Sequence, residues 1–509
     1  MSSTSIIILC TIFAYMSILI GVGIYNSRKN SSSEDFYLGG RSMGPYVVAM
    51  SAEASDMSSW LLMGLPGVAY FSGLADPFWT AAGLAIGTYL NWLLVSRRLR
   101  RYSEIVDAIT VPTFFAKRFH DKKNVISAIS AALIIIFFVP YVASGFAACG
   151  KLFNTLFGLD YQVGMILFAI IIVIYTIMGG FTTVATNDFI QSIVMSVALI
   201  SITIFGVSQA GGLDAVMENA KSLPGYLSLT MSHNAVSNTA TPYGVLTTVS
   251  ILAWGLGYFG MPHVLVRFMS IGDEKELVVS RRVASVWVVI AMGVAVFIGI
   301  VGLAMVGVGS MEALADPETV IIAITDLLAK NGFLTAILGG VILAGILAAT
   351  MSTADSQLLV AASGVSEDII RDFMGKKLTE KQSLLIARLT ILIVSVIGVF
   401  IARDPNSSVF GIVSFAWAGI GAAFSAVMLC ALFWKRTTLQ GAIAGMVSGG
   451  VMAFVWKYAI RPLGGIFDIY ELLPAFLISF VAIVIVSLLT KAPSQEIMDE
   501  FEKAKGIVK

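Results

Sequence analysis

The chain has 509 residues, of which 57% are hydrophobic and only 12% are charged. Soluble domains carry about a quarter charged residues, so this composition excludes a water-soluble globule and indicates a protein that crosses a membrane repeatedly. The formal net charge of +1 excludes the basic excess of a nucleic-acid-binding protein and the acidic excess of a disordered tail.

Apolar segments of helical length follow one another along almost the whole chain. A bilayer core of about 30 Å needs roughly twenty apolar residues in a helix, and by that criterion the sequence predicts about 13 transmembrane helices. We expect them at residues 6–25, 47–71, 78–95, 126–149, 163–178, 190–205, 245–265, 284–306, 333–360, 389–401, 409–432, 442–458 and 472–489. The first has no basic segment before it and no small-residue cleavage site after it, so we expect it to be retained rather than removed as a signal peptide.

Lysine and arginine gather in alternate loops, at 97–123, 267–282, 371–381 and 435–436. Cytoplasmic loops of membrane proteins hold the positive excess, so these loops are expected on the cytoplasmic side. The intervening loops, such as the long polar stretch 209–241, carry few cations. With an odd number of spans, we expect a multi-pass protein of a bacterial inner membrane with its N-terminus outside and its C-terminus in the cytoplasm.

The second span is interrupted by a polar run. Residues 51–60 place Glu53, Asp56 and several serine hydroxyls at membrane depth, and Pro66 follows. Ionisable residues are costly inside a membrane and usually mark function. Since proline removes a backbone donor and glycine loosens a helix, the sequence predicts a break whose carbonyls and amides can meet a ligand.

The seventh span contains a second unusual run. Residues 254–263 combine Gly255, Gly257, Gly260 and Pro262 with aromatic side chains. Glycine and proline are common in membrane helices, so a simple packing kink explains this run equally well. Broken helices at matching places in two halves nevertheless point to the binding site of a transporter built from inverted repeats.

The spacing of the two breaks predicts the internal organisation. Five spans separate them, so we expect repeat 1 at 45–206 and repeat 2 at 240–434, within a single membrane transport domain over 1–509. A first helix and cytoplasmic loop at 1–44 would precede the repeats, and extra helices with a charged tail at 435–509 would follow them. No residue-level similarity between the halves is visible.

The ninth span brings neutral oxygens together after a stretch of small residues. The hydroxyls of Ser352 and Thr353 lie three and four positions after Ala349, on the same helix face as its carbonyl. Small residues here also suit close helix packing. Hard cations prefer oxygen ligands, and a monovalent ion that is released in every cycle suits neutral dipoles, so this face predicts a sodium site.

At these residues the chain resembles the solute:sodium symporter family, and within it the bacterial carriers of L-proline. The resemblance runs almost from end to end. It is carried by LGGRS at 38–42, ASDM at 54–57, WLLMGLPG at 60–67, WGLGYFG at 254–260, ILAA at 346–349, MST at 351–353 and SFAWAG at 414–419.

This resemblance implies an all-α polytopic membrane protein with a leucine-transporter-type 5+5 inverted repeat and additional helices. It implies sodium-coupled uptake of L-proline by alternating access, with sodium as the coupling ion, no other cofactor and no enzymatic activity. The lipid bilayer is the expected environment, and no nucleic acid is expected as a partner.

The resemblance also implies a set of site residues. Sodium would bind backbone carbonyls and hydroxyls of Ala54, Met57, Ala349, Ser352 and Thr353. The substrate would be surrounded by Ser58, Trp60, Tyr141, Trp254 and Tyr258. Asp56 and Arg41 would serve sodium coupling, and Asp188, near the cytoplasmic side of the sixth span, would guide sodium out. Glu53 and Asp355 depart from the family pattern, which leaves either an extra cation contact or a proton-linked step open.

The chemistry of proline agrees with the aromatic set. Aromatic faces suit an apolar ring and a secondary ammonium, and the N-terminus of a half-helix suits a carboxylate. Ordinary helix packing is the alternative explanation for Trp60, Trp254 and Tyr258.

Three other kinds of function are alternatives to sodium-coupled proline uptake. Another small amino acid or a carboxylate such as pantothenate would keep the class and change the solute. A channel would need a selectivity filter or charged ring, and an enzyme or sensor would need a metal cluster, a nucleophile with a base, or a signalling domain. His120, His233 and His263 are scattered, and the three cysteines have no metal-ligand spacing.

Overall fold

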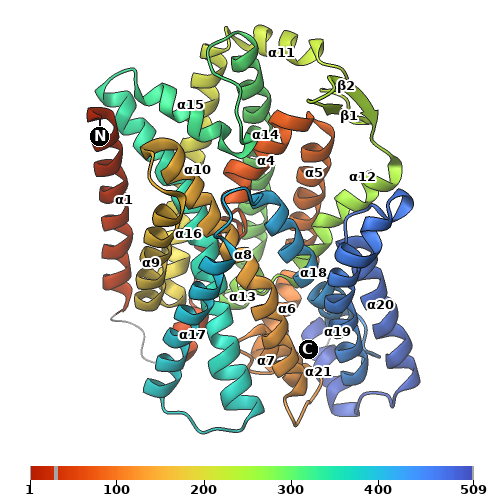
Figure 1. The fold of residues 1–509 in the computed structure, drawn as a ribbon. Coiled ribbons are helices and arrows are strands. Elements are labelled where there is room, and N and C mark those ends of the chain that lie inside the picture. Colours follow the sequence, from red (N-terminus) through yellow and green to blue (C-terminus); the bar gives the residue numbers. More distant parts are fainter. Residues whose placement is uncertain (1, 28–32, 507–509) are drawn as a thin grey trace.

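The computed structural model describes residues 2–27 and 33–506 and shows a tall bundle of helices (Figure 1). The long helices are α1 (Ser3–Ser27), α5 (Ala75–Leu90), α8 (Val125–Phe157), α9 (Tyr161–Gly179), α10 (Phe181–Gln209), α14 (Leu277–Gly307), α16 (Phe333–Ser363), α17 (Glu380–Ile401), α18 (Val409–Phe433), α19 (Leu439–Val455) and α20 (Leu472–Leu489). Shorter helices are α2 (Ser33–Leu38), α6 (Ser96–Ile105), α7 (Val111–Arg118), α11 (Leu213–Ser222), α15 (Val320–Ala329) and α21 (Gln495–Lys505). Segments of 3₁₀ or π type are η1 (Gly39–Arg41), η3 (Asn91–Val95), η5 (Glu274–Glu276), η6 (Pro317–Thr319), η7 (Gly364–Phe373), η8 (Trp456–Ile460), η9 (Arg461–Leu463) and η10 (Gly465–Phe467).

The first predicted break is present. Helix α3 (Pro45–Asp56) ends where Met57 leaves the helical conformation at φ −79° and ψ 70°. The chain continues through η2 (Trp60–Gly64), a π-type turn, into α4 (Leu65–Ser72). The break therefore falls before Pro66, which lies in the first turn of α4.

The second predicted break is also present. Helix α12 (Val245–Leu252) tightens into the 3₁₀ segment η4 (Ala253–Gly260), Met261 is extended, and α13 (Pro262–Ser270) follows. The two halves of this span are bent by 45°.

The predicted spans correspond to apolar helices. Within the described part of the chain, ten helices are long and apolar enough to cross a membrane, and the bent pair α12 to α13 raises the number to eleven. Two shorter apolar helices, Trp60–Ser72 and Tyr161–Ile177, occupy the remaining predicted positions. The first of them is the second half of the first broken span, so its shortness follows from the break itself.

The first broken span lies at the centre of the bundle. Helix α3 packs against α10, α13, α14 and α16. Its last nine residues, from Val48 to Asp56, are all buried. A polar helix end is therefore held inside the molecule by helices from both halves of the chain.

The long polar stretch between α10 and α12 contains more structure than a plain loop. It holds α11 and a small antiparallel hairpin of β1 (Met231–Asn234) and β2 (Thr239–Pro242). Figure 1 shows these elements together at the upper end of the bundle. Together with an isolated bridge between Met43 and Ile271, the hairpin departs from the all-α prediction.

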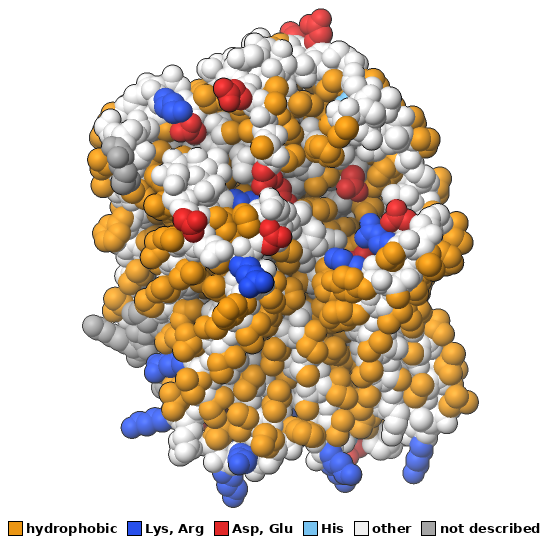
Figure 2. All heavy atoms as spheres, in the orientation of Figure 1, with side chains coloured by type: hydrophobic (Ala, Val, Ile, Leu, Met, Phe, Trp, Pro, Cys, Tyr) orange, Lys and Arg blue, Asp and Glu red, His pale blue; other side chains and the backbone are white. Residues whose placement is uncertain are grey.

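The surface carries an apolar girdle. Large apolar side chains are exposed on the outer helices, including those of Phe13, Ile170, Ile204, Val289, Phe400 and Leu489. Figure 2 shows hydrophobic side chains over the flank of the bundle and lysine and arginine side chains projecting from its lower end. An apolar surface of this extent is costly in water and favourable against lipid.

Candidate functional site

Neutral oxygens of α3 and α16 meet at the first break. The hydroxyl of Ser352 lies 2.7 Å from the carbonyl oxygen of Ala54 and 3.1 Å from that of Ala349. The hydroxyl of Thr353 lies 3.3 Å from the Ala349 oxygen. Four of the five predicted sodium ligands are therefore adjacent. The fifth, Met57, is fully buried three residues after Ala54, where α3 ends.

The end of α3 explains why the Ala54 carbonyl points to another helix. In a continuous helix this oxygen would accept a bond from the amide of Ser58. Here that amide turns back to the carbonyl of Asp56, at 2.9 Å. The Ala54 oxygen is left for Ser352, and the negative end of the α3 dipole is directed at the same place. Such a group of neutral oxygens suits a monovalent cation.

Asp56 connects this oxygen group to the aromatic residues. The hydroxyl of Tyr258 donates to the Oδ2 atom of Asp56. The backbone carbonyl of Asp56 lies 3.0 Å from Nε1 of Trp60 and 3.3 Å from the hydroxyl of Tyr141. Its Oδ1 atom has no hydrogen-bond partner among the described residues. Trp60, Tyr141 and Tyr258 of the predicted substrate set therefore meet at one buried aspartate.

Trp254 extends the aromatic group. Its ring centroid lies 6.2 Å from that of Trp60 and 5.0 Å from that of Tyr470. Its carbonyl accepts a 2.9 Å hydrogen bond from Nε1 of Trp417. Tyr470 and Trp417 were missed by the sequence analysis as site residues, although Trp417 lies within the SFAWAG motif. Ser58 also lies at the break, with its hydroxyl 3.4 Å from the amide of Trp60.

The aromatic group is closed to solvent in this conformation. Trp60, Tyr141, Trp254 and Tyr258 are each only 1% exposed. Access to them from solvent requires movement of the neighbouring helices.

Asp188 lies apart from the oxygen group, on α10. Its Oδ2 atom accepts hydrogen bonds from Ser51 at 2.6 Å and from Arg267 at 2.8 Å. Arg267 was predicted to begin a basic cytoplasmic loop, and that prediction is wrong. The residue lies inside α13 and is 1% exposed, because its charge is compensated by the buried carboxylate of Asp188.

Arg41 lies in η1, before α3, and does not touch the oxygen group. Its guanidinium donates to the hydroxyl of Ser103 and to the carbonyls of Met269 and Ala108, at 2.6 to 3.1 Å. Burial lowers the pKa of Arg41, and the nearby Arg100 lowers it further. The side chain joins the loop before α3 to the end of α13, so it connects the two broken spans.

The two acids that depart from the family pattern are both buried. One carboxylate oxygen of Glu53 accepts a 2.8 Å hydrogen bond from Nε1 of Trp92. Asp355 lies on α16, with Oδ1 3.3 Å from the hydroxyl of Ser356. Glu53 is therefore held against η3, whereas Asp355 lies near the Asp188 and Arg267 pair.

Known proteins resemble this chain in sequence. Residues 36–449 match the model of the sodium:solute symporter family. The chain belongs to that family. A relative named sodium/proline symporter 2, from Staphylococcus saprophyticus, and one named sodium/proline symporter, from Staphylococcus aureus, are each 40% identical to it over 506 residues. Each match covers 98% of this chain and 96% of the relative.

Solved structures resemble the fold. A Na⁺-coupled sialic acid symporter in a substrate-bound, outward-open state has a TM-score of 0.78 at 18% identity, over 96% of this chain and 99% of that one. MhsT in complex with L-phenylalanine has a TM-score of 0.52 at 14% identity, over 87% and 97% of the two chains. These likenesses confirm the predicted leucine-transporter fold of a multi-pass membrane protein.

Proposed function

We propose that this symporter couples inward sodium movement to the uptake of L-proline by alternating access. The observation that carries the proposal is the Ser352 hydroxyl, which lies within hydrogen-bonding distance of carbonyls on two different helices. The names of the relatives, which are 40% identical over nearly the whole chain, support sodium and proline as the transported pair.

Sodium is proposed to bind the carbonyls of Ala54, Met57 and Ala349 and the hydroxyls of Ser352 and Thr353. Such an ion would hold the end of α3 against α16. Since α3 leads directly into the break with the aromatic residues, sodium binding would also fix the walls of the substrate site. Linked sites change each other's affinity by the same factor, which is the thermodynamic basis of coupling.

Proline is proposed to bind between Ser58 and Trp60 of the first break, Tyr141 of α8, and Trp254 and Tyr258 of the second. The aromatic rings suit an apolar pyrrolidine ring and its ammonium group. Asp56, which the Tyr258 hydroxyl contacts, would add a negative charge close to both the cation and the ammonium.

The N-terminus is proposed to lie outside and the C-terminus in the cytoplasm of a bacterial inner membrane. In support, α1 begins at the upper end of the bundle and α21 lies at the lower end, where lysine and arginine side chains project (Figures 1 and 2). The repeats are proposed to be 45–206 and 240–434, each beginning near a broken span. We further propose transport without catalysis, with sodium as the ion required.

Uptake of labelled L-proline into proteoliposomes tests the proposal. An inward sodium gradient should drive accumulation above the external concentration, and a potassium or proton gradient of equal size should not. A panel of unlabelled amino acids and carboxylates, pantothenate included, should fail to compete. Competition by another solute would reassign the substrate, and uptake without a sodium gradient would refute the coupling.

A further inference from the structure

Arg267 is a buried cation that joins three helices beneath the sodium ligands. Its Nε donates to the hydroxyl of Ser51 on α3, at 2.7 Å. Its Nη2 donates to Asp188 on α10 at 2.8 Å and to Ser356 on α16 at 2.6 Å. A further bond joins Nη1 to the carbonyl of His263 on its own helix.

A single hydroxyl links this cation to the main chain of the proposed sodium ligand Ser352. The hydroxyl of Ser356, which accepts from Arg267, itself donates to the carbonyl of Ser352 at 2.7 Å. A sodium ion that leaves Ser352 towards the cytoplasm therefore meets the guanidinium about one helical turn further on. Two positive charges at such a distance repel each other strongly unless a carboxylate stands between them.

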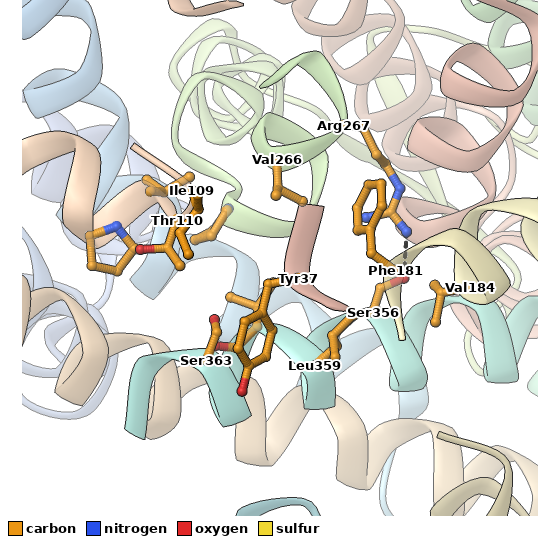
Figure 3. Close-up of a pocket in the computed structure, with 14 residues that line it drawn as sticks. Tyr37, Ile109, Thr110, Phe181, Val184, Val266, Arg267, Ser356, Leu359 and Ser363 are labelled. Carbon is orange, nitrogen blue, oxygen red and sulfur yellow. Dashed lines mark hydrogen bonds between the residues drawn. The ribbon is translucent and has the colours of Figure 1, made fainter. Parts of the chain in front are cut away.

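A small cavity opens on the other side of Arg267. Arg267 and Ser356 line it together with Phe181, Tyr37 and Ser363 (Figure 3). Figure 3 shows the hydrogen bond between Arg267 and Ser356 at one side of this cavity, with the Phe181 ring beside the guanidinium. The Arg267 Cζ atom lies 5.6 Å from the centroid of that ring, within reach of a cation–π contact.

We propose that Arg267 is a tethered cation that competes with sodium for Asp188 and so controls sodium release. While sodium is held by its ligands, Arg267 neutralises Asp188. During release the guanidinium swings into the cavity beside Phe181, and the departing ion takes its place at the carboxylate. Return of Arg267 then displaces the ion towards the cytoplasm. This inference rests on the proposed sodium coupling and assigns the release step to a residue of the second broken span.

The local charge count gives the direction of the effect. Asp188 and Asp355 both lie near Arg267, and Ser356 contacts Arg267 and Asp355 at once. Removal of the guanidinium leaves the carboxylate of Asp188 as a buried charge without its ion-pair partner. Such a site holds a cation instead of passing it on. The variant Arg267→Gln should therefore bind sodium more tightly and release it more slowly.

The first experiment separates binding from release. Binding of ²²Na⁺ to the purified protein without proline should show a half-saturating concentration at least about fivefold lower for Arg267→Gln than for the wild type. Net proline uptake should slow by about tenfold or more, because release then limits the cycle. Proline exchange with saturating sodium on both sides of the membrane requires no sodium release, so it should stay within about twofold of the wild type.

Two further variants make the test decisive. In the double variant Arg267→Gln with Asp188→Asn the unpaired charge is removed, so sodium affinity should return towards the wild-type value. Arg267→Lys keeps the positive charge and loses the planar fork, so it should keep near-wild-type sodium affinity while net uptake slows. The lysine variant also tests the role of Arg267 in sodium release if the glutamine variant does not fold.

The outcomes are distinct. Unchanged or weaker sodium binding in Arg267→Gln, equal losses of exchange and net uptake, or purely additive effects in the double variant would each overturn the role of Arg267. If the wild type binds ²²Na⁺ but transports no proline, the substrate assignment fails, and the sodium-binding comparison of the variants still tests Arg267.

Discussion

The two broken spans differ in what their backbone oxygens contact. At the first break the carbonyl of Ala54 meets a hydroxyl of α16, beside the buried carboxylate of Asp56. At the second break the carbonyls of Trp254, Gly257 and Tyr258 accept hydrogen bonds from side chains of the surrounding helices. These donors are Trp417, Ser425 and Asn91.

The glycines of the second break serve close packing. A Cβ atom on Gly255 would lie 2.1 Å from the carbonyl oxygen of Gly83 on α5, and one on Gly257 would lie 2.2 Å from Nε1 of Trp417. A broken helix is therefore not by itself an ion site. The first break leaves a backbone oxygen facing a hydroxyl of another helix, whereas the second positions aromatic rings against a fixed scaffold.

The largest effect is expected for Gly255→Ala, because the new methyl group would overlap the backbone of α5. We expect a loss of about 3 kcal/mol or more, seen as a lower Tm in detergent and a low yield of folded protein. Gly293→Ala on α14 is the control, since a Cβ there meets no atom within 4 Å. Equal Tm values for the two variants would show that the second break is loosely packed.

Asp56→Asn should have the next largest effect, and on function instead of folding. Asparagine keeps an oxygen that can accept from Tyr258, so the change removes mainly the charge. We expect sodium affinity to fall by roughly a hundredfold, about 2.7 kcal/mol, with a parallel fall in sodium-stimulated proline binding. Equilibrium binding of ²²Na⁺ and of labelled proline measures both. A wild-type sodium affinity would remove Asp56 from the coupling mechanism.

Ser352→Ala should weaken sodium binding by about tenfold, or 1.4 kcal/mol, because one neutral ligand is lost. Thr353→Ala should do less, since its hydroxyl is 3.3 Å from the Ala349 oxygen, whereas that of Ser352 contacts two carbonyls. The sodium dependence of proline uptake provides the measurement. Thr350→Ala is the control, because that hydroxyl bonds within its own helix to Ile346. A larger loss in the control would place the sodium site elsewhere.

The smallest effect is expected for Trp417→Phe. This change removes the hydrogen bond to the Trp254 carbonyl and should cost about 1 kcal/mol of stability. Sodium binding without proline should be nearly unchanged, and proline binding should weaken only modestly. Thermal unfolding and the two binding assays distinguish these effects. A sodium affinity that fell as far as in Ser352→Ala would mean that the second break contributes to the ion site.

Much of the fold could be predicted from sequence because the membrane imposes simple rules. Spans need about twenty apolar residues, and backbone groups must be satisfied within each helix, so apolar length predicted the helices. Glycine and proline predicted both breaks, and ionisable residues at membrane depth marked the first. The hairpin of β1 and β2 was missed, since its polar segment lies outside the apolar spans and is subject to neither rule.

The sequence alone determined the membrane class, the places where two helices break, and the spacing that puts Ala349, Ser352 and Thr353 on one helix face. These are local properties of composition and helical period. Only the tertiary structure decided that Ser352 meets Ala54 and that Arg267 is buried against Asp188 instead of exposed in a loop. Both depend on contacts between residues far apart in the chain, 298 positions in the first case and 79 in the second. Whether a polar group meets water or a partner is set by the packing of the whole bundle.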